Sequence, residues 1–300
     1  MVYNYEKVSC INDNKKGITF IKTYDVFESS IQYTYVKCPD CGLIYANPRF
    51  NKKSLNDYYI KVYSKEDFTI DTGYLFKLKK LQFRFNRKIN KKINKGKLLD
   101  IGCGDGFLLR MQKENGWDVY GQDINPKAVT NLKKLGIKCY SCDISRLPYK
   151  KYFDVITLFH VLEHIDNPKK FLLKIKSLIK NNGSLIIEVP NINSLEANIF
   201  KSGNIYLGAP VHLFQFSEQN LRLLLETNGF NVTSVKYNWI SPQAYTFSFI
   251  HLFERKFNLK INVKAKFMIS LLLSLITIPV HGVASLFKKS NTLTFYAKLK

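Results

Sequence analysis

A glycine-rich turn directly after an apolar run is the most informative chemical motif of this chain. Residues 98–106 read Leu-Leu-Asp-Ile-Gly-Cys-Gly-Asp-Gly, and helical spacing of apolar residues follows. Gly102 and Gly104 let a ligand approach the backbone closely because they lack a Cβ atom, and Gly106 lets a helix begin near the strand. The pattern therefore predicts a cofactor loop at the carboxyl end of a first strand.

Two acidic residues follow the loop at spacings that suit an adenosine-containing cofactor. Asp123 ends a second strand about 20 residues past the loop, where a carboxylate can accept hydrogen bonds from both ribose hydroxyls. Asp143 follows a third strand, where an acceptor can meet an adenine amino group. Because Phe107 follows Gly106, the motif is Gly-x-Gly-x-Gly rather than the dinucleotide Gly-x-Gly-x-x-Gly, which favours S-adenosylmethionine (SAM) over NAD.

This set of motifs resembles the class I SAM-dependent methyltransferase superfamily, over roughly residues 96–240 and the final strand. The resemblance implies a doubly wound, Rossmann-like α/β fold with a seven-stranded sheet in the order 3-2-1-4-5-7-6 and an antiparallel last strand. A Rossmann-like fold that binds NAD, or no cofactor, is the alternative. We expect the SAM site to comprise Asp100, Gly102, Cys103, Gly104, Gly106, Asp123, Ile124, Asp143, Ile144 and Phe159.

Three histidines are candidates for a catalytic base. His160 and His164 lie one helical turn apart where the fourth strand passes into a helix, and His212 precedes a helix capped by Ser217. A base is needed only when the acceptor has a high pKa, and each histidine could instead be a structural hydrogen-bonding residue. Some RNA-tail and quinone O-methyltransferases carry a similar Glu-His pair, so Glu163 and the three histidines could also hold a divalent metal.

The first 50 residues carry half of a zinc-binding motif, Cys38-Pro-Asp-Cys41. They resemble the small zinc-ribbon-like module that precedes the core in a subset of bacterial methyltransferases, which normally has two Cys-x-x-Cys pairs. Here the first pair reads Cys10-Ile-Asn-Asp13, so one thiolate is missing. Either Asp13 completes a zinc site with Cys10, Cys38 and Cys41, or the metal has been lost and packing holds the module.

Short apolar runs bounded by Gly, Asn and Pro alternate with helical patterns between residues 96 and 240 and predict a mainly parallel sheet covered by helices. We expect strands at 97–101, 117–122, 137–141, 153–159, 184–189 and 231–237, and helices at 107–115, 126–135, 168–180 and 218–228. A further helix is expected at 74–93. The predicted division is a Cys module (1–50), a basic helical linker or cap (51–95), the SAM-binding core (96–240), an apolar helical insertion (241–289) and the last strand (290–300).

A mainly apolar segment, Phe267–Phe287, is long enough to span a bilayer, with Lys266 and Lys288 at its ends. A span would separate residues 291–300 from the sheet they are expected to join. Pro279, His281 and Gly282 suggest a break into two shorter pieces, so we favour a helical hairpin that packs over the acceptor cleft or lies in a membrane interface. A buried hairpin, a hairpin in a membrane interface and a true span all stay open.

Charge and cysteine content restrict the partners and the compartment. The net charge is +23, but only seven of the 46 basic residues are Arg, and Lys, Asn and Ile abound together, which favours a compositional origin of the charge over nucleic-acid binding. Six scattered cysteines and a polar N-terminus favour a reducing cytoplasm as the compartment, and peripheral contact with a membrane is compatible with it.

We expect a bacterial methyltransferase acting on a small-molecule, sugar or lipid-like acceptor. An RNA-directed methyltransferase and a non-catalytic SAM-binding or zinc scaffold protein are the alternatives.

Overall fold

The computed structural model describes residues 3–25, 31–63, 95–238, 243–257 and 259–300. The helix expected at 74–93 lies outside these residues. The chain forms two compact units, each assembled from three separate segments. Unit 1 comprises Met1–Lys65, Pro190–Leu221 and Tyr237–Leu293, and unit 2 comprises Glu66–Val189, Arg222–Lys236 and Thr294–Lys300. The five-part division expected from the sequence stays a prediction.

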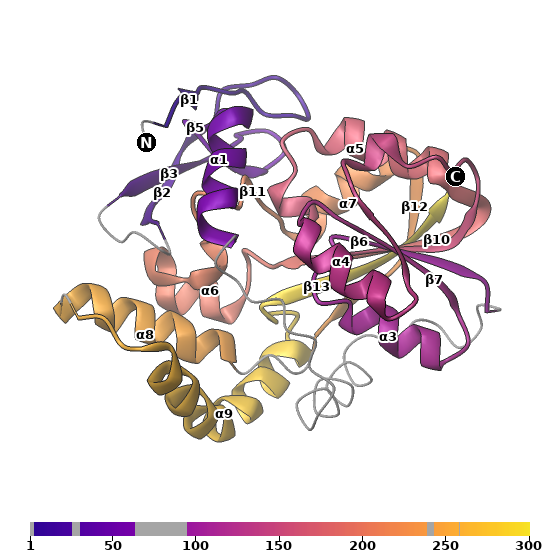
Figure 1. Cartoon of the computed structure of the whole chain (residues 1–300). Coiled ribbons are helices and arrows are strands. Elements are labelled where there is room, and N and C mark those ends of the chain that lie inside the picture. The colour runs from indigo at the N-terminus through magenta and orange to yellow at the C-terminus, as the bar shows by residue number, and fades with distance from the viewer. Residues whose placement is uncertain (1–2, 26–30, 64–94, 239–242, 258) are drawn as a thin grey trace. The chain divides into compact units, whose positions relative to one another are not determined.

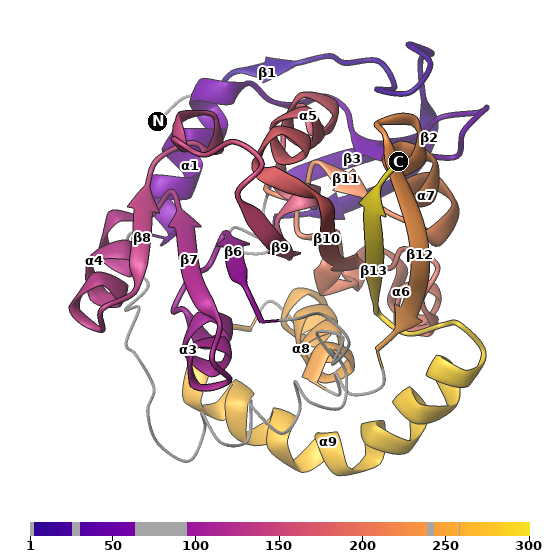
Figure 2. The ribbon, with the colours of Figure 1, turned by 90° about the vertical axis from the view of Figure 1, so that its right-hand side faces the viewer.

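A seven-stranded sheet forms the centre of unit 2 (Figures 1 and 2). Its order is β8-β7-β6-β9-β10-β13-β12, which confirms the expected 3-2-1-4-5-7-6. Neighbouring strands from β8 to β10 run parallel. The strands are β6 (Lys97–Ile101), β7 (Asp118–Asp123), β8 (Lys138–Ser141), β9 (Phe153–Phe159), β10 (Ile179–Pro190), β12 (Phe230–Tyr237) and β13 (Thr292–Leu299).

The last strand runs against its neighbours, as the resemblance implied. Lys300 donates its backbone N–H to Gly229, and Thr233 donates its hydroxyl to the carbonyl of Tyr296, so β12 and β13 are antiparallel. The central strands are buried on both faces, which explains why their sequences are continuous apolar runs rather than alternating ones.

Four helices cover the sheet, α3 and α4 on one face and α5 and α7 on the other (Figure 1). They are α3 (Phe107–Glu114), α4 (Pro126–Lys134), α5 (Pro168–Leu178) and α7 (Glu218–Thr227). The starts of α4 and α5 follow from local chemistry. Asn125 and Asn167 accept backbone hydrogen bonds at the N-cap, and a proline at the first helical position has no N–H left to satisfy.

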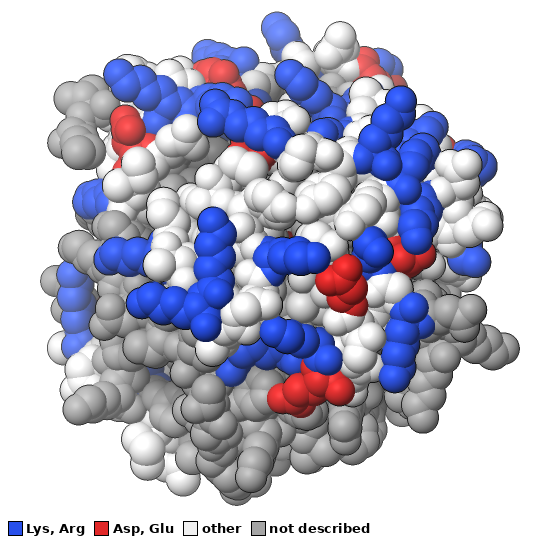
Figure 3. Space-filling view, turned by 45° about the vertical axis from the view of Figure 1, so that its right-hand side comes forward, with Lys and Arg blue, Asp and Glu red and all other residues white. Residues whose placement is uncertain are grey.

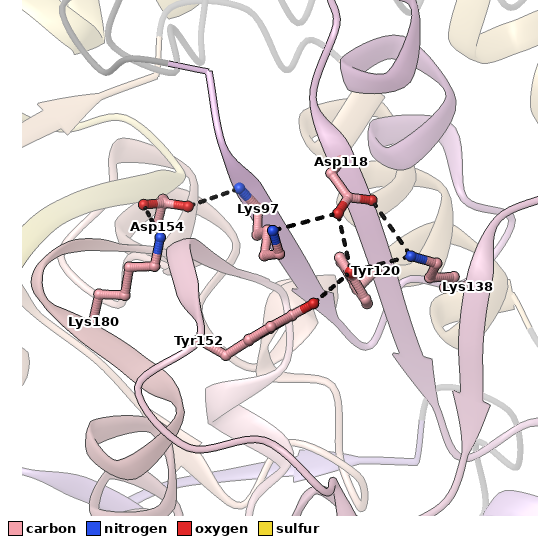
Figure 4. Close-up of polar contacts among 7 residues, drawn as sticks. All are labelled: Lys97, Asp118, Tyr120, Lys138, Tyr152, Asp154 and Lys180. Atoms are coloured by element: carbon pink, nitrogen blue, oxygen red, sulfur yellow. Dashed lines mark hydrogen bonds and ion pairs between the residues drawn. The ribbon is translucent and has the colours of Figure 1, made fainter.

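A polar and aromatic network closes the amino-terminal edge of the sheet (Figure 4). The buried Tyr120 donates to Asp118 at 3.0 Å and accepts from Lys138 at 3.3 Å, and its hydroxyl lies 3.0 Å from that of Tyr152. The ammonium group of Lys97 lies 5.1 Å from the centre of the Tyr152 ring. These contacts link the beginnings of β6, β7 and β8 to Tyr152, the residue before β9, at the edge opposite the glycine-rich loop.

Unit 1 contains a four-stranded sheet in the order β11-β4-β3-β2 and a two-stranded ribbon of β1 and β5. The strands are β1 (Tyr5–Glu6), β2 (Ile18–Tyr24), β3 (Gln32–Lys37), β4 (Ile44–Ala46), β5 (Arg49–Phe50) and β11 (Phe214–Gln215). Its helices are α1 (Lys52–Tyr63), α6 (Leu195–Phe200), α8 (Gln243–Phe257) and α9 (Val263–Leu286). Because β11 pairs with β4, residues far apart in the sequence complete one sheet.

The expected break of the apolar segment at Pro279 is wrong. Helix α9 continues from Val263 to Leu286 with Pro279 inside it, and Figure 2 shows the helix as a curved ribbon. A proline in a helix interior removes one backbone hydrogen bond and bends the helix, but it does not have to end it. The hairpin consists instead of α8 and α9, which pack against each other. No helix among the described residues is both long and apolar enough to cross a bilayer.

Candidate functional site

The glycine-rich loop connects β6 to α3 and has the backbone conformation that its sequence requires. Gly102, Gly104 and Gly106 have φ angles of 68°, 50° and 69°, in the left-handed region that favours glycine. A Cβ atom on Gly106 would lie 2.1 Å from the Leu132 side chain, so this glycine allows α3 to pack closely on α4. At Gly104, in contrast, no described atom lies within 4 Å of the position of a Cβ. The loop therefore presents open space beside the Gly104 backbone, where a ligand fits.

Asp123, the final residue of β7, ties this loop to the neighbouring strand. Its Oδ2 accepts the backbone N–H of Gly104 at 2.9 Å, and its Oδ1 accepts that of Asn125 at 2.8 Å. Each carboxylate oxygen can accept a second hydrogen bond. Asp123 therefore holds the loop and still has acceptor capacity for two hydroxyl groups.

The other residues expected in the cofactor site follow the carboxyl ends of β6 to β9, which meet at one edge of a parallel sheet. Asp100 is buried at the end of β6 and accepts the Thr157 hydroxyl at 2.6 Å. Asp143 is exposed and is the N-cap of the 3-10 helix η1 (Ile144–Arg146), where its side chain accepts the backbone N–H of Ser145. Of the remaining residues, Cys103 and Ile144 are buried, Phe159 is half-buried and Ile124 is exposed.

His160 lies between two buried carboxylates at the same edge. Its Nδ1 is 3.4 Å from Oε1 of Glu163, and its Nε2 is 3.3 Å from Oε1 of Glu188. Its φ of 56° is rare outside glycine, and its backbone N–H is bound by the carbonyl of Glu188. Burial alone would lower the pKa of His160, but the hydrogen bonds and charges of Glu163 and Glu188 outweigh it and raise the pKa to about 9.

A pKa of about 9 makes His160 an imidazolium at neutral pH, so the side chain has no lone pair to accept a proton. Of its two acidic partners, only Glu163 was considered as a candidate site residue in the sequence analysis. Glu163 belongs to the Glu-His pair, but Glu188 was missed, although an acid inside the apolar run Leu-Ile-Ile-Glu-Val was the available signal. Glu188 also accepts the Thr294 hydroxyl at 2.8 Å, which joins β10 to β13.

The two other candidate bases lie in different units. His164 ends the 3-10 helix η2 (Leu162–His164) of unit 2 and is half-buried. His212 belongs to unit 1, where its Nδ1 lies 2.8 Å from the carbonyl oxygen of Tyr206. A carbonyl can only accept, so Nδ1 carries the proton, and in the neutral ring the lone pair is on Nε2. The set of four metal ligands that includes His212 stays a prediction.

The structure brings the four residues of the Cys module together within unit 1. The Sγ atoms of Cys10 and Cys41 are 3.4 Å apart, and Sγ of Cys38 lies 3.1 Å from Oδ2 of Asp13. All four candidate ligand atoms lie within 4.8 Å of one another. In a tetrahedral zinc site with Zn–S bonds of about 2.3 Å, the sulfur atoms lie about 3.8 Å from one another. The four donor atoms and their spacing therefore fit a zinc ion.

Comparison with known proteins identifies the family. A family model described as a methyltransferase domain matches residues 75–235. The tRNA U34 carboxymethyltransferase of Idiomarina loihiensis is 30% identical over 149 residues, which cover 46% of each chain. The mitochondrial ubiquinone biosynthesis O-methyltransferase of Schizosaccharomyces pombe is 35% identical over 102 residues, 30% of this chain and 36% of that one. The chain thus spans less than half the length of these two relatives.

A solved structure extends the likeness to nearly the whole fold. The 1,6-didemethyltoxoflavin-N1-methyltransferase of Burkholderia thailandensis, solved with 1,6-didemethyltoxoflavin and S-adenosylhomocysteine, covers 94% of this chain and is itself covered completely. Its TM-score is 0.51 at 13% identity, a likeness that concerns the fold alone. Since the family model covers more than half of the sequence and the strand order agrees with it, the chain belongs to the class I SAM-dependent methyltransferases.

Proposed function

We propose that this protein transfers a methyl group from SAM to a small-molecule, sugar or lipid-like acceptor. One observation carries the proposal. The Gly104 backbone faces open space, and its N–H is held by a carboxylate that retains acceptor capacity for ribose hydroxyls. When bound, the cofactor supplies a methyl group on a sulfonium, which is already a good leaving group. The work left to the protein is to hold donor and acceptor in line and to exclude water.

The proposed roles of the cofactor residues follow from their places at the sheet edge. Asp123 accepts the ribose hydroxyls, and Asp143 accepts the adenine amino group. Gly102, Gly104 and Gly106 give the ligand access to the backbone, with Asp100 buried below them. The apolar side chains of Ile124, Ile144 and Phe159 line the adenosine site, whereas the Cys103 thiol packs in the core near Cys139, so Cys103 contributes through its backbone.

Among the three histidines, His212 best suits a general base. Its ring is held through Nδ1 by the Tyr206 carbonyl, which leaves the lone pair on Nε2. His160 is a positioning residue, because as an imidazolium it cross-links the loop after β9 to β10. His164, the last residue of η2, stays a candidate for either role.

Binding of S-adenosylhomocysteine tests the cofactor site directly. Calorimetric titration of the full chain should give micromolar affinity, and Asp123→Ala should weaken binding at least about tenfold because hydrogen bonds to a carboxylate are lost. Asp118→Ala is the matched control, since Asp118 lies on the same strand at the opposite sheet edge. A folded wild-type protein that binds no cofactor would refute the proposal.

An RNA acceptor is the second candidate, favoured by the likeness to a tRNA carboxymethyltransferase. Lys and Arg side chains predominate on the face drawn in Figure 3, but among the coloured residues they are scattered rather than gathered in one track. Methyl transfer from labelled SAM to glycosyl and lipid acceptors, compared with bulk tRNA, separates the two. RNA affinity that falls steeply with salt, together with methylated RNA, would replace the small-molecule assignment. Cofactor binding without any transfer would indicate a scaffold protein.

We further propose that Cys10, Asp13, Cys38 and Cys41 hold a structural zinc ion in a reducing cytoplasm. Metal analysis of protein purified without chelators should give one zinc per chain. Cys38→Ser should lose most of it, whereas Cys142→Ser, a change at a half-buried cysteine outside the cluster, should retain it. Equal zinc content in the two variants would contradict the assignment.

A further inference from the structure

The helical hairpin of α8 and α9 carries a concentration of exposed apolar side chains. Twelve of the 21 large apolar residues that are exposed among the described residues lie between 249 and 287. Isolated exposed apolar residues are normal on a protein surface, but a concentrated set marks an interaction site. The twelve are Phe249, Phe253, Phe257, Leu259, Met268, Leu272, Ile276, Ile278, Val280, Val283, Leu286 and Phe287.

These side chains follow helical rows. Phe249, Phe253 and Phe257 are spaced four residues apart on α8, and the centres of neighbouring rings are 6.4 and 4.6 Å apart. Met268, Leu272 and Ile276 have the same spacing on α9. Residues four apart lie on one side of a helix, so each helix presents an apolar stripe.

The other side of α9 packs within unit 1. His281 is buried, and the centre of its ring lies 4.6 Å from that of Tyr245 on α8. Ala284 is buried as well. A helix with one side packed against protein and the other side exposed is suited to lie along a surface.

The charge of the hairpin indicates what covers the apolar stripes. Residues 243–293 contain Glu254 as their only acid against seven bases: Arg255, Lys256, Lys260, Lys264, Lys266, Lys288 and Lys289. Glu254 is mostly buried and is engaged by the Lys266 ammonium at 2.8 Å and by the backbone N–H of Ile261 at 2.7 Å. Arg255 lies over the Tyr24 ring, but Lys256, Lys260, Lys288 and Lys289 are exposed, so the hairpin combines exposed apolar residues with an excess of positive charge.

We propose that the α8–α9 hairpin docks onto an anionic membrane surface. Its apolar side chains enter the boundary between headgroups and acyl chains, and its lysines contact the phosphates. An apolar protein partner would not require the excess of positive charge, whereas anionic lipid complements both the exposed apolar residues and the lysines. The proposal does not depend on which acceptor is methylated.

Flotation of the full chain with vesicles tests the proposal. Wild-type protein should float with phosphatidylcholine vesicles that contain phosphatidylglycerol, and much less with phosphatidylcholine alone. The double change Leu272→Ser and Ile276→Ser should lower vesicle affinity at least about tenfold. Its matched control is Leu173→Ser with Leu223→Ser, which alters exposed leucines on α5 and α7.

A second pair of variants tests the charge. Lys288→Glu with Lys289→Glu should lower affinity for the anionic vesicles at least about tenfold, whereas Lys150→Glu with Lys151→Glu, an exposed pair in unit 2, should change it little. Unchanged titration with S-adenosylhomocysteine shows that each variant is folded. The proposal is overturned if wild-type protein binds neither kind of vesicle, or if the variants in the hairpin float with anionic vesicles as well as their control variants do. It is also overturned if the serine variant only abolishes a dimer seen by analytical ultracentrifugation.

Discussion

Replacing Glu196 with glutamine is expected to remove a pH-dependent loss of stability in unit 1. Glu196 on α6 is fully buried, and its carboxylate accepts hydrogen bonds from the Ser248 hydroxyl on α8 and from the Asn291 amide. Burial raises its pKa from 4.5 to about 7, against the opposing effect of these two hydrogen bonds. Glutamine keeps the shape and can accept from Asn291 and donate to Ser248, but it carries no charge.

The sign and size follow from proton linkage. Between pH 4.5 and about 7 the folded protein holds a proton on Glu196 that the unfolded chain has already released, so this carboxyl makes stability fall as pH rises. A pKa change from 4.5 to about 7 corresponds to about 3 kcal/mol of unfolding free energy, which is lost in full above that range. The advantage of Glu196→Gln over wild type should therefore grow by about 3 kcal/mol between pH 4.5 and pH 8.

Urea unfolding of both proteins across this pH range measures the difference, and circular dichroism follows the transition. Glu114→Gln, a change at an exposed carboxylate on α3, is the matched control for the loss of one negative charge. Other titrating groups affect wild type and variant equally, so they cancel in the difference. A difference that stays constant with pH would refute the reasoning, because it would mean that Glu196 is ionised in the folded protein throughout.

Two further predictions concern the glycine loop and the imidazolium. Gly106→Ala should cost about 2–4 kcal/mol in urea unfolding because it adds a clash with Leu132 to left-handed strain, whereas Gly104→Ala should cost only about 1–2 kcal/mol but weaken binding of S-adenosylhomocysteine. Equal costs would contradict the packing argument. In an NMR titration the His160 ring should have its midpoint near 9, and Glu188→Gln should lower it; a wild-type midpoint below 7 would contradict the carboxylate pair.

The core of the fold could be predicted because its signals are local. The central strands β6 and β9 are short, mainly apolar runs, and the glycine loop directly follows β6. Strand ends differ by a residue or two, as in β7, which runs from Asp118 to Asp123 where 117–122 was expected. β10 is longer, from Ile179, because its first residue already pairs with Phe153 after the C-terminus of α5.

The features missed from the sequence depend on distant partners. The sequence around Glu188 does not indicate that His160 contacts it. The sequence around Glu196 likewise does not indicate its hydrogen bonds with Ser248 and Asn291, because these partners belong to other elements. Pro279 was expected to end a helix because proline interrupts helical hydrogen bonding, but α9 continues through this residue and packs against α8. The pairing of β11 with β4 likewise joins segments about which spacing carries no information.

The position of β13 in the sheet has a consequence for how the chain is made. This strand, residues 292–299, lies between β10 and β12, which both leave the ribosome earlier. Until it emerges, the edge of β10 has no partner on that side and β12 has no neighbour in the sheet. The nascent chain must therefore keep two strand edges apart and shielded from other chains until the strand that joins them has been synthesised.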